Sequence, residues 1–466
     1  MFELSPHIDK NKIFLVNLSE IEGVLSPLFF KSKPIPLKYN QKLKKIANIN
    51  PIRNKPVFND KDLVPYVGLP ETDEHTREIT SIVLRPYKEV KGRNIIYPND
   101  ILFARIEPSI FNQKYIFAGD LKGYDFAFTS TEFYIIEQKS IDIKYIFHLL
   151  FSDYIFNQIK GKTTGSTGRR RLDLEAFKNI EVPVIDEYKQ IIDLYETAYQ
   201  TKQQKEAKAE QLLNNIDDYL LGELGITLPE KDNSLENRMF KVNFSEITGE
   251  RFDCDYYQIY YKNLEKSIEN CTFDVIQIKD VVSFIGSGKT PASTDYSDTP
   301  TDFPIIKAGS YTDEFIDLNK VDYTTIKPTI YAKKGDIFIL SAAHQAEYVG
   351  KQIKYLDDIP EQKTSFVGEL ICIRANTLTI NSVYLFSLLN LNIYKTLLNR
   401  EKTGQTSHIY AKDIKNIFIP KPRIEKQNEI AEHIKEIREQ AKQLKSEAKE
   451  VLEQAKQEVE KMILGK

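Results

Sequence analysis

The chain repeats itself, and this duplication constrains its architecture more than any other feature of the sequence. The segment Phe14–Gly23 reappears as Phe240–Gly249, with seven of the ten positions identical. Further matched segments follow in the same order, and the offset between partners stays between 226 and 239 residues. Because chance matches would not keep one register along 466 residues, the sequence predicts two copies of one structural unit in tandem.

The ends of the two copies resemble each other more than their middles do. The later matches are Pro65-Tyr-Val with Pro304-Ile-Ile, Asp100-Ile-Leu-Phe with Asp336-Ile-Phe-Ile, Tyr145–Leu150 with Tyr384–Leu389, Thr164-Gly165 with Thr403-Gly404, Lys178–Pro183 with Lys415–Pro420, and Lys189-Gln190 with Lys426-Gln427. Shared ends indicate a shared scaffold, and different middles indicate different ligands or targets.

The middle of each copy predicts an α/β or α+β globule with a substantial sheet, because short β-type runs alternate with turn residues. The runs are Ile79–Leu84, Ile135–Ile136, Asp336–Leu340 and Leu370–Arg374. Apolar residues at three-to-four spacing predict one helix over Tyr145–Ile159 and another over Tyr384–Leu398.

A long helix is expected to close each copy, because both tails are rich in Glu, Lys, Gln and Ala and carry heptad-spaced apolar residues. The second seam is Ile430, Ile434, Ile437, Ala441, Leu444, Ala448, Val451 and Ala455. The first is Tyr188, Ile192, Tyr195, Tyr199, Ala209, Leu213, Ile216 and Leu220, interrupted by polar Lys202 and Glu206. Neither helix can bury its stripe alone, so we expect the two to pair as a coiled coil.

Antiparallel pairing would place one globule at each end of the coiled coil, although the sequence leaves parallel packing open. A coiled coil that joins separate chains is the alternative, and the duplicated layout favours the internal pair. Gly222, Gly225 and Pro229 are expected to end the first helix. The predicted domains are an N-terminal segment 1–32, a first globule 33–184, helix 185–226, a linker and second start 227–273, a second globule 274–421 and helix 422–464.

Composition limits the classes of function. The chain has a net charge of −3, so any nucleic-acid surface must be local. It has no long apolar run and no secretory signal, and its three cysteines have no metal-ligand spacing. We therefore expect a cytoplasmic protein with reduced thiols that binds neither membrane nor metal.

At this point the layout resembles the specificity subunit of type I restriction–modification systems. Ile285–Ser293, which contains Gly288-Lys-Thr-Pro291, followed by Phe303–Ile306, is similar to that family's target-domain opening. Thr164–Gly168, Lys178–Pro183 and Lys189-Gln190 are similar to its exit into the spacer helix, and the second copy repeats this exit. The first copy departs from the pattern, because Ile46–Pro51 reads IANINP where the opening motif would stand.

The resemblance implies that the chain is a non-catalytic subunit that reads DNA. Each globule would be a target-recognition domain for one half of a bipartite, asymmetric site, and the paired helices would set the spacer. The implied partners are double-stranded DNA, two adenine-methyltransferase subunits and, in a restriction complex, the translocase–nuclease subunit. The methyl donor would bind the methyltransferase, so no cofactor is expected here.

Basic and polar residues in glycine-containing loops are the candidates for DNA contact, because small residues admit phosphates and arginine makes bidentate contacts. In the first copy they are Arg105, Lys162, Thr164, Gly165, Ser166, Thr167, Arg169, Arg170 and Arg171. In the second they are Lys289, Thr290, Ser293, His344, Lys402, Thr403, Gly404, Gln405, Thr406, Ser407 and His408.

Two enzyme-like motifs are weak. Gly286-Ser-Gly-Lys-Thr290 resembles a phosphate-binding loop, but Ser283 stands where that loop needs its first glycine. Glu89-Val-Lys91 and Glu361-Gln-Lys363 have a nuclease-like spacing that a highly charged chain shows by chance. The alternative functions are a protein-binding scaffold on a coiled-coil spacer and an enzyme fused to a recognition module. The latter is disfavoured because the duplication occupies the whole chain.

Overall fold

The computed structural model describes residues 15, 37, 39–165, 170–232, 234, 239–244, 247, 252–312, 314–358, 363–404 and 407–465. The chain divides into two compact units. Unit 1 contains the residues up to 206 together with 446–466, and unit 2 contains 207–445. Each unit therefore combines one globule with half of each long helix. Of the predicted N-terminal segment 1–32, including Phe14–Gly23, all residues but Leu15 lie outside the described residues.

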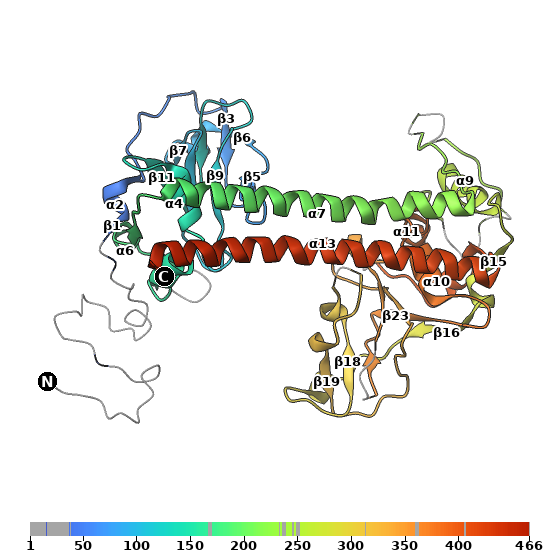
Figure 1. Ribbon diagram of the computed structural model, residues 1–466. Helices are drawn as coiled ribbons and strands as arrows, with labels where there is room; N and C mark the ends of the chain where they lie inside the picture. The colour runs from blue at the N-terminus through green and yellow to red at the C-terminus, as the bar shows by residue number, and fades with distance from the viewer. Residues whose placement is uncertain are drawn as a thin grey trace. The chain divides into compact units, whose positions relative to one another are not determined.

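Unit 1 is built from short strands and helices that lead into the first long helix (Figure 1). Its strands are β1 (Asn40–Lys42), β2 (Ala47–Ile49), β3 (Leu63–Val67), β4 (Thr72–Asp73), β5 (Glu78–Ile79), β6 (Val83–Pro86), β7 (Asn94–Ile96), β8 (Asp100–Ala104), β9 (Tyr115–Ala118), β10 (Ala127–Thr129), β11 (Phe133–Gln138), β12 (Thr163–Thr164), β13 (Arg171–Leu172) and β14 (Glu181–Pro183). Its helices are α2 (Leu43–Ile46), α3 (Tyr87–Val90), α4 (Ile143–Leu149), α5 (Asp153–Ile159), α6 (Leu174–Lys178) and the start of α7 (Tyr188–Leu224).

Unit 2 repeats this plan. Its strands are β15 (Val275–Gln277), β16 (Val282–Ser287), β17 (Tyr296–Ser297), β18 (Pro304–Ile306), β19 (Asp322–Thr324), β20 (Ile337–Leu340), β21 (Ile353–Tyr355), β22 (Ser365–Phe366), β23 (Leu370–Ala375) and β24 (Phe418–Pro420). Its helices are α9 (Ile259–Glu269), α10 (Ser382–Asn390), α11 (Asn392–Arg400), α12 (Ala411–Lys415) and the start of α13 (Ile424–Leu464), with 3-10 turns at η3 (Ile278–Asp280), η4 (Ser293–Asp295), η5 (Ala308–Ser310), η6 (Leu318–Lys320) and η7 (Ala346–Tyr348).

The two units share one sheet plan. An antiparallel sheet has the order β2-β11-β8-β9 in unit 1 and β16-β23-β20-β21 in unit 2. A second sheet, β6-β3-β10-β7 or β17-β19-β18-β22, contains a parallel pair in each case, with Phe128 opposite Tyr66 and Ile305 opposite Ser365. The chain is thus a mixed α/β protein, as its sequence pattern predicts.

Matched tyrosines close the two copies in the same way. The hydroxyl of Tyr145 donates to the Pro183 carbonyl at 2.7 Å, and that of Tyr384 donates to the Pro420 carbonyl at 3.0 Å. All four residues belong to sequence matches between the copies. The two segments are conserved between the copies because the tyrosine, on α4 or α10, must reach the strand that leads into the long helix, β14 or β24.

Each antiparallel sheet begins its second strand with a buried aspartate that needs an arginine. Asp336 lies opposite Arg374, and the guanidinium binds both carboxylate oxygens at 2.7 Å. Asp100 instead lies opposite an acid, Glu137, and Arg53 reaches in from the preceding loop to bind both carboxylates. The same buried charge is therefore neutralised from two different places in the sequence.

The helices predicted over Tyr145–Ile159 and Tyr384–Leu398 are each two helices, which corrects the single-helix prediction. In unit 1 the break comes at Ser152, whose hydroxyl oxygen accepts a hydrogen bond from the Ile155 amide as the N-cap of α5. In unit 2 the break comes at Leu391, which has extended backbone. Apolar spacing alone could not show these breaks, because the hydrophobic pattern continues across them.

The long helices contribute to one hydrophobic core in each unit. In unit 1, Ile192 and Tyr195 near the start of α7 share a core with Val459 and Ile463 near the end of α13. In unit 2, Leu220 near the end of α7 shares a core with seam residues near the start of α13, Ile430 and Ile434. Within each unit the start of one long helix thus packs with the end of the other.

The predicted seam faces inward along its described length. Ile192, Tyr195, Ile216, Leu220, Ile430 and Ile434 are buried, and Tyr188, Tyr199, Leu213, Ile437, Leu444 and Val451 are partly buried. At the polar interruption Lys202 pairs with Glu206 at 2.7 Å, and Lys205 pairs with Glu447 of α13. The interruption is thus filled by ion pairs.

Helix α7 passes through Gly222 and ends just before Gly225, so the predicted end moves by a few residues. Gly225 has a φ of 66°, which favours glycine, and a side chain there would collide with Thr272. The Ile226 amide donates to the Leu221 carbonyl at 2.9 Å and closes the helix end. Among the residues described, no helix combines the length and hydrophobicity that a membrane span requires.

His148 makes the stability of unit 1 depend on pH. Its ring is 6% exposed, stacks on Tyr195 at 5.1 Å, and has an Nδ1 atom without a hydrogen-bond partner in the described structure. Burial, followed by repulsion from Arg77 and Lys144, lowers its pKa to about 3. Because the unfolded chain binds this proton near pH 6.5, stability is lost as the pH falls below that value.

We expect the free energy of unfolding to fall by about 2 kcal/mol between pH 7.5 and pH 5 through this residue alone. Chemical unfolding of the wild type and of His148→Phe at both pH values measures it. The variant should show a smaller loss by that amount, and equal losses in the two proteins would contradict the assignment.

Candidate nucleic-acid interface

In unit 1 the predicted loop and the predicted strand-end arginine come together. Strands β12 and β13 form a hairpin in which Thr164 lies opposite Arg171. The hairpin extends the antiparallel sheet β2-β11-β8-β9 beyond the end of β8, because the Leu172 amide donates to the Arg105 carbonyl at 2.8 Å. The Glu107 amide also donates to the Arg170 carbonyl at 3.0 Å. Residues separated by more than 60 positions in the sequence thus share one end of the sheet.

Each described arginine of the hairpin has an acidic neighbour. Arg171 binds both oxygens of Glu132, with its Nε at 2.9 Å and its Nη2 at 2.7 Å. Arg170 donates to the Thr163 carbonyl at 3.0 Å and lies 3.9 Å from the Glu107 carboxylate. The hydrogen bond from Arg171 lowers the pKa of Glu132, although burial opposes this. Both guanidinium groups remain partly exposed.

Arg105 is held by an aromatic ring. Its guanidinium lies 5.1 Å from the centre of the Tyr134 ring, and its buried Nε has no hydrogen-bond partner in the described structure. The Tyr134 hydroxyl donates to the Leu172 carbonyl at 2.6 Å, which ties this ring to the hairpin. Three arginines, two of them beside Glu132 and Glu107, thus gather at one sheet end, and their partly exposed guanidinium groups can bind phosphates or guanine edges.

Unit 2 builds the same frame with different side chains. The Ile409 amide donates to the Ser341 carbonyl at 3.0 Å, as Leu172 does to Arg105, and His408 bridges Thr403 and Ala342. Polar groups replace the basic ones here. Ser407 follows Gly404 across two residues outside the described structure, and the Lys402 ammonium donates to the Ala346 carbonyl. The frame can therefore present hydroxyl and imidazole groups to a ligand.

The predicted loop from Ser287 to Ser293 joins this end of unit 2 through Thr290. The Thr290 hydroxyl donates to Glu369 at 2.8 Å and accepts from the Gly368 amide at 2.9 Å. Gly288 lies against the Phe366 carbonyl, where a side chain would collide. Lys289, Ser293 and His344 are exposed.

Five predicted site residues, Ser166, Thr167, Arg169, Gln405 and Thr406, lie outside the described residues. Lys162 and Gly165 flank strand β12 of the unit 1 hairpin. Sequence reasoning missed Glu132 and Glu369, which stand at matching places because their carbonyls accept from the Arg105 and Ser341 amides. Glu132 and Glu369 are 237 residues apart, an offset within the range of the matched segments, so the duplication could have identified them as a pair. A single matching glutamate is a weak signal, however, because the chain contains many acidic residues.

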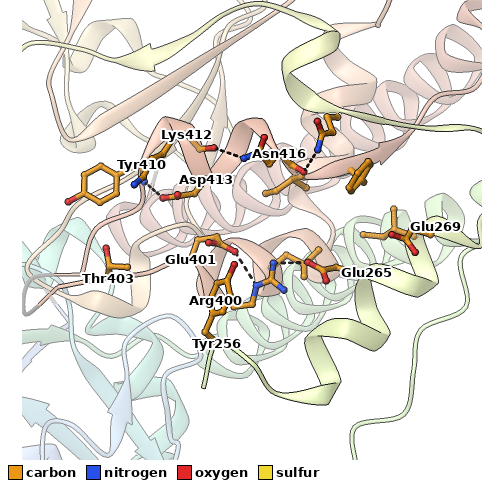
Figure 2. Close-up of a pocket in the computed structure, with 15 residues that line it drawn as sticks. Tyr256, Glu265, Glu269, Arg400, Glu401, Thr403, Tyr410, Lys412, Asp413 and Asn416 are labelled. Carbon is orange, nitrogen blue, oxygen red and sulfur yellow. Dashed lines mark hydrogen bonds and ion pairs between the residues drawn. The ribbon is translucent and has the colours of Figure 1, made fainter. Parts of the chain in front are cut away.

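A polar cleft of about 540 Å³ lies beside Thr403 in unit 2 (Figure 2). Its central cation, Arg400, binds Glu265 at 2.7 Å and Glu401 at 3.1 Å, and it lies 4.9 Å from the Tyr256 ring centre (Figure 2). The ion pair between Arg400 and Glu265 connects α11 to α9. Because two carboxylates already neutralise Arg400, the cleft is a poor site for an added anion.

Comparisons with known proteins agree with this geometry. Residues 270–454 match the family described as the type I restriction modification DNA specificity domain. A solved chain described as "Structural basis underlying complex assembly and conformational transition of the type I R-M system" is 17% identical, with 93% of this chain and 98% of that chain covered and a TM-score of 0.53, so the two share a fold.

Two further solved structures are similar at lower scores. The HsdS subunit from Thermoanaerobacter tengcongensis is 18% identical, with coverage of 93% and 94% and a TM-score of 0.36. The type I restriction–modification S subunit from M. genitalium is 13% identical, with coverage of 89% and 93% and a TM-score of 0.42. A comparison with curated protein sequences finds no match.

Proposed function

We propose that this chain is a DNA specificity subunit of a type I restriction–modification system and that it reads a bipartite, asymmetric site with one unit for each half; the family match over residues 270–454 supports this. The observation that carries the proposal is the repeated frame at the sheet ends. The same backbone contacts present arginines in unit 1 and hydroxyl and imidazole groups in unit 2. Two domains with the same backbone arrangement but different exposed side chains are expected to recognise different DNA sequences.

The proposed target-recognition domains are 33–184 and 274–421. They follow an N-terminal segment 1–32 and a linker 227–273, and the spacer helices 185–226 and 422–464 pair as an antiparallel coiled coil. The cores that the two long helices share in each unit support this pairing. A fixed helix pair would set the unread gap between half-sites, and joint binding of both halves would raise affinity through effective concentration.

The chain itself is proposed to be non-catalytic. Two adenine-methyltransferase subunits would dock on it, with the translocase–nuclease subunit added in a restriction complex, and the methyl donor would bind the methyltransferase. The residues proposed to contact DNA are those of the unit 1 hairpin with Arg105, and those of the unit 2 frame with Lys289, Thr290, Ser293 and His344.

Mapping of methylated adenines in host DNA, with and without this gene, tests the function. We expect one asymmetric motif, two short blocks around an unread gap, to lose its methylation when the gene is deleted. If every methylated motif survives although the methyltransferase is expressed, the chain is a protein-binding scaffold. Salt-dependent binding of the purified chain to duplex DNA separates the two functions independently.

A further inference from the structure

Unit 1 contains a cleft of about 630 Å³ that the proposed DNA contacts do not use. Its walls come from the β4–β5 hairpin, the end of β9, helix α4 and the first half of α7, and it is lined by Thr76, Arg77, Glu78, Ile79, Phe117, Gly119, Asp120, Lys122, Lys144, Phe147, His148, Glu196, Tyr199, Gln200 and Gln203. Ala118, at the end of β9, pairs with Asp100 at the start of β8. The cleft therefore lies at the opposite end of the sheet from Arg105.

Arg77 is the unusual residue of this cleft. It is 8% exposed, and its guanidinium lies 3.5 Å from the Phe151 ring centre and 5.2 Å from that of Tyr199. Within the described part of the chain, no hydrogen bond or ion pair joins this guanidinium to another residue. Burial lowers the pKa of Arg77, but a guanidinium stays charged at neutral pH. A buried cation without an anion is costly unless something supplies the anion.

The other basic groups of the cleft do have partners. Lys144 pairs with Glu196 at 2.6 Å, and Lys122 donates to the Thr80 carbonyl at 2.7 Å. His148 is neutral because its pKa is depressed to about 3. Arg77 is thus the cation of the cleft that lacks a polar partner among the described residues.

Unit 2 shows what this place in the fold accepts. The Tyr355 amide of β21 donates to the Glu314 carbonyl at 3.1 Å, just as the Phe117 amide of β9 donates to the Arg77 carbonyl at 3.1 Å. Glu314 therefore stands where Arg77 stands in unit 1. Its carboxylate forms an ion pair with Arg438 on α13, with the Nε atom 2.8 Å away. In unit 2 the site holds a complete carboxylate–arginine pair.

Unit 1 lacks the acidic half of this pair. By the burial pattern, Ile191, Ile192 and Tyr195 of α7 match Ile430, Ala431 and Ile434 of α13, and Tyr199 then takes the place of Arg438. In unit 2 the arginine of this site, Arg438, is on the long helix, whereas in unit 1 the arginine is Arg77 of the β4–β5 hairpin. The residue of the long helix that faces Arg77 is the uncharged Tyr199. The glutamate has no counterpart in the described residues of unit 1.

We propose that Arg77 binds a carboxylate side chain presented by a methyltransferase subunit, and this inference rests on the proposed function. Phe117 and Phe147 provide apolar contact for the stem of that side chain. Glu78 and Asp120 are exposed among the lining residues and would repel a polyanion, so they disfavour DNA phosphates and favour a protein segment that carries its own basic residue.

The Arg77 contact makes the two methyltransferase sites unequal. If two copies of one methyltransferase dock, the copy at unit 1 gains the Arg77 contact. The copy at unit 2 does not, because Arg438 there is already paired with Glu314. The two copies are therefore held with unequal affinity.

The test is a native mass-spectrometric titration of the intact chain with the methyltransferase of the same system. For Arg77→Gln we expect one of the two bound copies to weaken at least tenfold while the other is unchanged. The matched variant Arg77→Glu with Tyr199→Arg rebuilds the unit 2 pair inside unit 1. It should fold as stably as the wild type and show the same selective loss.

Each outcome separates the inference from the function. If Arg77→Gln and the double variant both bind two copies with wild-type affinities, Arg77 is not an anchor. The inference also fails if the double variant is as stable as the wild type and binds both copies normally, even where Arg77→Gln proves unstable. If the wild type itself binds no methyltransferase, the proposed function is what fails.

Discussion

Replacing Arg374 with methionine is expected to destabilise unit 2 by about 3–5 kcal/mol, because it strands a buried carboxylate. Asp336 is fully buried, and both of its oxygens are bound by this guanidinium at 2.7 Å. Arg374 also donates to the partly buried Tyr331 carbonyl at 2.8 Å, so the substitution leaves a second acceptor without its donor. Urea unfolding of the wild type and the variant at pH 7.5 measures the difference.

A double variant makes this prediction specific to the charge. Arg374→Met with Asp336→Leu removes both charges, and an apolar pair of similar volume can replace a buried ion pair with little loss. We expect the double variant to recover most of the stability that the single variant loses. A single variant within about 1 kcal/mol of the wild type would show that Asp336 is not held by Arg374 in solution.

Replacing Arg170 and Arg171 together with alanine is expected to weaken binding to the target motif on the order of a hundredfold or more. Each arginine that contacts a base or a phosphate contributes roughly 1–3 kcal/mol. The substitution also leaves Glu132 without the partner that binds both of its oxygens, so its charge would repel the DNA backbone. Methylation of the motif by the assembled complex, followed against DNA concentration, gives the change in affinity.

The control for this variant removes the same charge from the other end of the same sheet. Lys44 and Lys45 of α2 are exposed and lie just before strand β2, whose first residue pairs with Gln138 at the end of β11. Phe133, at the start of β11, pairs with Ala104, which is next to Arg105. Lys44→Ala with Lys45→Ala should bind the motif within a few-fold of the wild type. Equal losses in the two double variants would mean that net charge, and not the hairpin, determines affinity.

Several features of the molecule followed from sequence pattern because they are local or periodic. The duplication predicted two units with one frame, and the Tyr145 and Tyr384 hydrogen bonds show why the matched segments are alike. The heptad spacing predicted which residues of α7 and α13 face inward, since a helix places every third or fourth residue on one face. The breaks at Ser152 and Leu391 escaped this reasoning, because a capping residue interrupts the backbone and not the apolar pattern.

The sequence by itself determined that the chain is duplicated and that each copy ends in a long helix with an apolar stripe, because repetition and periodicity can be recognised without knowledge of contacts. Only the tertiary structure decided the charge partners. Arg171 meets Glu132 across 39 positions, and Asp100 meets Arg53 across 47. It also decided that Arg77 is buried without an acid, whereas Glu314 at the same place in unit 2 has Arg438. The energy of a charge pair depends on distance and burial, and for residues so far apart in the chain both are set by the fold.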